Sequence, residues 1–131
     1  MRKYKNLKVW EKATEMALQV YAETKTFPKD EMYGLTSQIR RSAISVPSNI
    51  AEGSERKSDK DFIRFLRIAN ASLAEMETQL YIAMKLGYLE ETCYMQLLQM
   101  TTEIGKMING LSSGLEVNTP STGDWRLATG D

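Results

Sequence analysis

The most constraining feature of the chain is a long apolar stripe between residues 62 and 83. Apolar side chains recur there at steps of three and four positions, through about six helical turns, which is the spacing of one helix face. Ser58 precedes the stripe as a suitable N-cap, with Asp61 three positions later. The pattern predicts a helix from Ser58 to Gly87, whose stripe residues are Phe62, Phe65, Leu66, Ala69, Leu73, Met76, Leu80 and Ala83.

Three further segments show the same period. The first spans residues 7–26 and stops before Pro28, because the residue before a proline is pushed out of helical geometry. The second spans residues 31–53 and ends at Gly53, a natural helix stop. The third spans residues 91–115 with a heptad-like seam. Their apolar faces are Leu7, Trp10, Thr14, Ala17, Tyr21 and Thr24 in the first, and Leu97, Thr101, Ile104, Ile108, Leu111 and Leu115 in the third.

Four such helices, joined by short connections and with no β-type alternation, predict an all-α fold. We expect an antiparallel up-down-up-down four-helix bundle over residues 1–115. Residues 116–131 are rich in Gly, Pro, Ser and Thr and carry no periodicity. They are predicted to be a disordered or loosely docked tail.

The composition excludes several kinds of chemistry. The chain of 131 residues has no histidine and one cysteine, Cys93. It therefore lacks the residues for a zinc site, an internal disulfide or a histidine-activated nucleophile, and we expect no metal, cofactor or small-molecule substrate. No apolar run is long enough for a membrane span, and the basic N-terminus has no apolar leader. With the single cysteine, this favours the cytoplasm.

The helix predicted over residues 31–53 contains an unusual stretch, QIRRSAISVPSNIAEG at residues 38–53. Pro47 inside it costs about 3 kcal/mol and predicts a kink. One face is an apolar seam of Ile39, Ala43, Val46 and Ile50. The face beside it is polar. We interpret it as a network fixing helix register, formed by Gln38, Arg41, Ser45, Asn49 and Glu52 with Glu75 and Gln79 of the next helix.

Two further hypotheses concern this polar seam. Arg40 or Arg41 is a possible ion-pair partner for Glu75. An active site is the less favoured interpretation, because an arginine and a carboxylate without a nucleophile make a weak catalytic arrangement.

A basic stripe is predicted on the outer face of the helix over residues 58–87, opposite its apolar stripe. Its members are Lys57, Lys60, Arg64 and Arg67, with Arg56 just upstream. A line of cations of this kind can follow a phosphate backbone, with Arg40 and Arg41 as further candidates. The alternative is a solvated face, partly neutralised by Asp59 and Asp61.

Farther along the same outer face the residues become small or apolar. Ala71, Ala74, Thr78 and Ile82 replace the charges, and Met95, Met100 and Met107 lie off the main seam of the last helix. A helix that is apolar on more than one side is buried on more than one side, so these residues predict a homo-oligomer interface. Additional core packing is the alternative explanation for the methionines.

Three stretches carry a resemblance to a known family. NLKVWEKA (6–13), KTFPKDEMYGLTSQIRRSAISVPSNIAEG (25–53) and FIRFLRIANASLAEMETQLYIAMKLGYL (62–89) resemble the four-helix-bundle proteins of the 23S ribosomal RNA intervening-sequence family. The resemblance implies an antiparallel bundle that assembles as a homopentamer. The accessory variability proteins of diversity-generating retroelements look like relatives. By that analogy, a basic surface would engage nucleic acid.

Together these features favour a non-enzymatic, oligomeric four-helix-bundle module that binds RNA or a ribonucleoprotein through the basic stripe. The alternative is a purely structural homo-oligomeric scaffold that binds a protein partner. Steep loss of nucleic-acid affinity with salt is expected only of the first.

Overall fold

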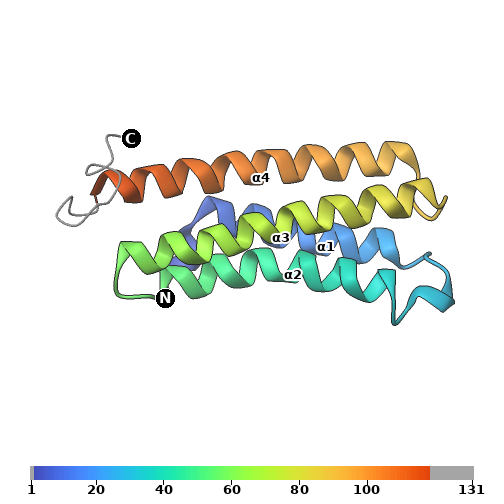
Figure 1. The fold of residues 1–131 in the computed structure, drawn as a ribbon, viewed down its shortest axis with the longest axis horizontal. Helices are drawn as coiled ribbons and strands as arrows, with labels where there is room; N and C mark the ends of the chain where they lie inside the picture. The colour runs from blue at the N-terminus through green and yellow to red at the C-terminus, as the bar shows by residue number, and fades with distance from the viewer. Residues whose placement is uncertain (1, 119–131) are drawn as a thin grey trace, which may run out of the picture.

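The computed structural model describes residues 2–118, and the described residues contain helices and no strand. Figure 1 shows four long helices side by side, with the chain direction reversing at each connection. α2 packs most extensively on α3, and α1–α2, α3–α4 and α1–α4 contacts complete the bundle. The predicted all-α four-helix fold is confirmed. The elements are η1 (Lys3–Asn6), α1 (Lys8–Thr24), η2 (Lys29–Glu31), α2 (Leu35–Ser54), α3 (Asp59–Lys85) and α4 (Glu91–Asn118).

Both ends of α3 form as their sequence signals predict. Ser58 is the N-cap, and its side-chain oxygen accepts a hydrogen bond from the Asp61 amide at 3.1 Å. At the other end Gly87 adopts a left-handed φ of 83°. The Gly87 amide bonds to the Met84 carbonyl and the Tyr88 amide to the Ala83 carbonyl, which is a Schellman motif. These caps fix where α3 starts and stops, and therefore where its outer face lies.

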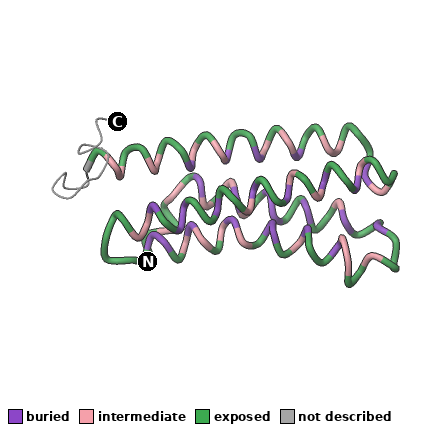
Figure 2. The backbone as a smooth tube through the Cα atoms, in the orientation of Figure 1, coloured by how far each residue is buried: buried purple, intermediate pink, exposed green. Residues whose placement is uncertain are grey.

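The core lies along the facing sides of the four helices (Figure 2). The predicted seam of α2 and the stripe of α3 are buried, apart from Phe62, which packs half-buried against the core. The predicted face of α1 is partly wrong. Trp10 and Thr14 are only half-buried and Tyr21 is exposed, because α1 is rotated so that a neighbouring stripe faces the core. That stripe is Val9, Ala13, Met16, Ala17 and Val20.

Gly53 has a different role from the predicted helix stop. α2 continues to Ser54, and Gly53 is buried and helical. A Cβ atom at this position would lie 2.6 Å from Cβ of Phe65 and 3.0 Å from Cδ1 of Phe62. Gly53 therefore permits the close approach of α2 to α3.

Two predictions concern other parts of the chain. α2 is helical on both sides of Pro47, and a kink there stays a prediction. α4 extends to Asn118, three residues beyond its predicted end at residue 115. The rest of the predicted tail, residues 119–131, lies outside the described residues. Within residues 2–118 no helix is long and apolar enough to cross a membrane.

Candidate nucleic-acid interface

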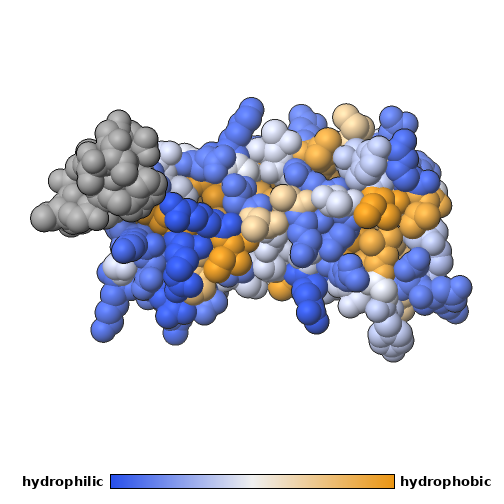
Figure 3. All heavy atoms as spheres, viewed as in Figure 1, coloured by the Kyte–Doolittle hydropathy of each residue, from blue (hydrophilic) through white to orange (hydrophobic). Residues whose placement is uncertain are grey.

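The basic stripe lies on the loop between α2 and α3 and on the first turns of α3. Its five members, Arg56, Lys57, Lys60, Arg64 and Arg67, are all exposed. In Figure 3 the part of the surface over the start of α3 is strongly hydrophilic, while the middle and far end of the same helix carry pale and hydrophobic atoms. Lys60, Arg64 and Arg67 lie on α3 itself, whereas Lys57, which the helical spacing placed on the same face, and Arg56 precede the N-cap of the helix.

The acidic residues near the stripe neutralise it only in part. Arg64 lies 3.7 Å from Asp61 and Arg67 lies 3.8 Å from Glu116, both long for ion pairs. Arg56 pairs with Glu52 at 3.0 Å, an exposed pair one helical turn apart. Lys57 and Lys60 form no ion pair with any of residues 2–118. Such exposed pairs contribute about 0–1 kcal/mol each, so an incoming phosphate can replace their carboxylates.

Two arginines of the stripe share one aromatic support. The guanidinium carbons of Arg56 and Arg64 each lie 4.7 Å from the ring centroid of Phe65. Phe65 is itself buried, and its Cβ atom lies close to Gly53 of α2. Cation–π contacts of this kind hold a guanidinium in place while its N–H groups stay free to bond. The loop between α2 and α3 is therefore tied to the stripe through Phe65.

Arg40 and Arg41 lie away from the stripe. Arg40 donates to the Thr24 hydroxyl at 2.9 Å and lies over the Tyr21 ring at 4.6 Å, which docks it on α1. Arg41 is exposed, and the Ser42–Glu75 contact puts it beside the middle of α3. With helices antiparallel at this level, Arg41 lies about 18 Å along the axis from Arg64, at 1.5 Å of rise per residue.

The predicted polar network exists in a smaller form, centred on Ser42. The Ser42 hydroxyl is buried and lies 2.7 Å from Glu75 Oε1, 2.9 Å from Gln79 Oε1 and 3.0 Å from the Gln38 carbonyl. A hydroxyl has one hydrogen to donate, so these three acceptors share it. Glu75 thus accepts from Ser42, not from Arg40 or Arg41.

A second pair of contacts lies one turn along α2. Ser45 and Ser72 hydroxyls are 2.8 Å apart, and Asn49 donates to both the carbonyl and the hydroxyl of Ser45. Ser42 and Ser72 were not among the predicted members of the network. Their polar role depends on the register between α2 and α3.

The remaining predicted members of the seam do not converge on a ligand site. Glu52 pairs with exposed Arg56, and Arg41 makes no hydrogen bond or ion pair within the described residues. Cys93 is no activated thiolate, since a hydrogen bond to Glu23, then burial, raises its pKa. Residues 2–118 contain no group of three side chains suited to hold a metal ion.

The predicted oligomer-interface residues divide into two groups. Ala71, Ala74, Thr78 and Ile82 are exposed along the outer face of α3, and Met95 is exposed on α4. Ile68, 40% exposed, extends the α3 face toward the basic stripe. Met100 and Met107 are instead half-buried against the core, so core packing accounts for them.

Fold and surface together define a class: an all-α bundle protein with exposed cations around the start of one helix and exposed small or apolar side chains farther along it. Comparison with known proteins makes the class specific. Residues 5–110 match the model of the family described as 23S rRNA-intervening sequence protein. Because the match covers most of the chain, the protein belongs to this family.

A solved structure supports the same assignment. It is a crystal structure of a protein with unknown function from the S23 ribosomal protein family of Bacteroides thetaiotaomicron. The two chains are 27% identical and superpose with a TM-score of 0.72, over 79% of this chain and 97% of the other. No curated protein matches the chain.

Proposed function

We propose that this protein is a non-enzymatic, homo-oligomeric module that binds RNA or a ribonucleoprotein through its basic stripe, in the cytoplasm. The observation that carries the proposal is the exposure of five cations on one surface, two of them lysines without an ion pair in the described residues.

The arrangement of the stripe suits a phosphate backbone. Lys60, Arg64 and Arg67 follow one helix face over about 10 Å, and Lys57 continues the line into the loop. Arg56 and Arg64 present their guanidinium groups from the Phe65 ring. Cations in this arrangement contact phosphates rather than base edges. Binding is therefore expected to depend on the charge and shape of the RNA more than on its nucleotide sequence.

Salt dependence tests this function on the unmodified chain. If four cations of the stripe contact phosphates, the slope of log K against log salt is about −3. Affinity for a fluorescently labelled structured RNA should then fall about 60-fold between 50 and 200 mM salt. Fluorescence anisotropy titrations at each salt concentration measure this affinity. Affinity that does not change with salt, or no binding at 50 mM, would contradict the proposal and favour the alternative, a homo-oligomeric scaffold for a protein partner.

The homo-oligomeric part of the proposal rests on the outer face of α3. Ile68 and Ile82 are 40% and 44% exposed there, with Ala71, Ala74 and Thr78 on the same face. Burying such a surface against another copy removes apolar area from water at about 25 cal/mol per Å². We propose that the assembly is the pentamer that the family resemblance implies.

Light scattering on the purified chain tests the assembly. A pentamer of 14.9 kDa chains has five times that mass. Ala71→Glu with Ile82→Glu should reduce the mass to that of smaller species while circular dichroism stays unchanged, because both positions are exposed. A wild-type chain that is monomeric at micromolar concentration would refute this part of the proposal.

A further inference from the structure

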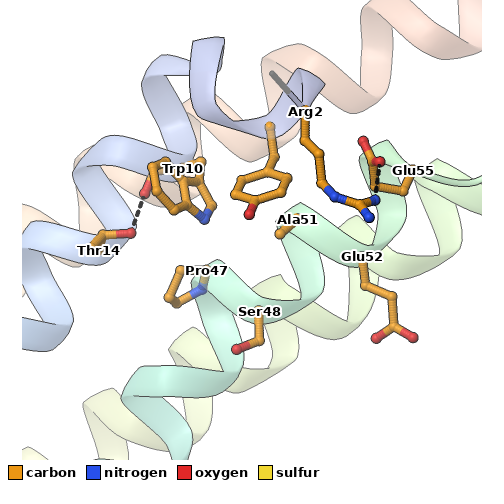
Figure 4. A pocket seen from close by; sticks show the side chains of 9 residues that line it. Arg2, Trp10, Thr14, Pro47, Ser48, Ala51, Glu52 and Glu55 are labelled. Carbon is orange, nitrogen blue, oxygen red and sulfur yellow. Dashed lines mark hydrogen bonds and ion pairs between the residues drawn. The ribbon is translucent and has the colours of Figure 1, made fainter.

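A second surface, which adjoins the basic stripe at Arg56, is a groove between α2 and the N-terminal segment. Its lining includes Tyr4 and Trp10 from the N-terminal part of the chain and Pro47 and Ala51 from α2. Arg2 and Glu55 lie at one end of it (Figure 4). The groove has a volume of about 560 Å³, within the range of ligand sites in proteins. It is open to solvent rather than enclosed, so it fits a segment lying across the surface better than a buried small molecule. We call it the aromatic groove.

The groove exists because short side chains face aromatic ones. Trp10 and Tyr4 pack edge to face with centroids 5.0 Å apart, and both remain half-exposed. Opposite them α2 presents Pro47 and Ala51, which leave space that longer side chains would fill. Pro47 therefore contributes a flat apolar surface opposite two aromatic rings. Its position inside α2 alone does not indicate this role.

The rim of the groove already holds a cation. Nη1 of Arg2 lies 2.8 Å from Oε1 of Glu55, as Figure 4 shows, and the Arg2 side chain is 70% exposed. A pair this exposed contributes little stability, so another guanidinium can take its place. Glu52, the other carboxylate of the groove, is held by Arg56 in a similarly exposed pair.

We propose that the aromatic groove binds an extended, basic segment of a partner protein, with an arginine of that segment replacing Arg2 on Glu55. Aromatic rings and a proline accept proline rings and the aliphatic stem of an arginine, and a carboxylate beside them accepts its guanidinium. Grooves lined by aromatic side chains recognise proline-rich segments in this way. RNA is disfavoured here, because bases stacked on Trp10 would bring phosphates close to Glu52 and Glu55.

The probe is a blocked hexapeptide of alternating arginine and proline, and the comparison peptide has glutamate in place of each arginine. A Trp125→Phe background leaves Trp10 as the only tryptophan, so its fluorescence reports on the groove. We expect a saturable change with the arginine peptide and none with the glutamate peptide. Absence of a Trp10 response at millimolar arginine peptide, or equal binding of both peptides, would overturn the proposal.

Matched variants locate the site. Glu55→Gln should weaken peptide binding about tenfold or more, because a hydrogen bond between two charged groups is lost. Glu15→Gln removes the same charge on the exposed side of α1 and should leave binding unchanged. Equal effects of the two changes would show that net charge, not the groove, binds the peptide.

Removing Arg2 should strengthen peptide binding, whereas removing the charge of Glu55 should weaken it. Arg2→Ala removes the resident cation and should tighten peptide binding by up to about fivefold, compared with the matched Lys3→Ala. Equal affinity of these two variants would overturn the claim that Arg2 occupies the arginine position. RNA affinity of Glu55→Gln should equal that of Glu15→Gln, because the two variants carry the same change in charge. This separates failure of the groove from failure of the basic stripe.

Discussion

Gly53→Ala is expected to lower the free energy of unfolding by about 1–3 kcal/mol, although glycine to alanine usually stabilises a helix. The added Cβ would lie 2.6 Å from Cβ of Phe65, an atom fixed to the backbone of α3. Neither helix can give way by a rotamer change alone, so α2 and α3 must separate along their most extensive interface. Urea unfolding followed by circular dichroism measures the change.

Gly110→Ala is the matched control for this substitution. Gly110 is also inside a long helix, but a Cβ there meets no atom within 4 Å. Its replacement should stabilise the protein by about 0.5–1 kcal/mol, the ordinary difference in helix propensity. If Gly53→Ala were as stable as the wild type, close packing would not be the reason for glycine at this position.

Much of the fold could be predicted from sequence because burial on one helix face is a local property. The core of α2 and the stripe of α3 follow directly from steps of three and four. α1 carries two adjacent stripes, and periodicity alone could not choose between them. Trp10 and Thr14 line the aromatic groove and are half-buried there. Residues facing a groove recur along a helix at the same steps of three and four as residues facing the core.

The parts of the candidate sites that sequence could not predict depend on contacts between helices. Ser42 meets Glu75 only because α2 and α3 pack in one register, and no residue within α2 reveals that register. Arg40 was grouped with the other cations by charge, but Thr24 and Tyr21 of α1 hold it elsewhere. The close approach at Gly53 has the same origin, because it is set by Phe62 and Phe65.

Reversing three charges of the basic stripe is expected to have the largest effect on binding. Lys57→Glu, Lys60→Glu and Arg64→Glu together should weaken RNA affinity at least about 100-fold at 50 mM salt, since three phosphate contacts become repulsions. The fold should persist, because all three side chains are exposed. Anisotropy titration measures the affinity, and circular dichroism checks the helical content.

The most direct test of the RNA-binding surface is one titration with two triple variants side by side. The control variant carries Lys25→Glu, Lys29→Glu and Lys106→Glu, three exposed positions outside the stripe that give the same change in net charge. If the stripe binds RNA, the stripe variant loses affinity about 100-fold while the control stays within about threefold of the wild type. Equal losses in both variants, or a stripe variant that binds like the wild type, would contradict the assignment of the stripe as the RNA-binding surface.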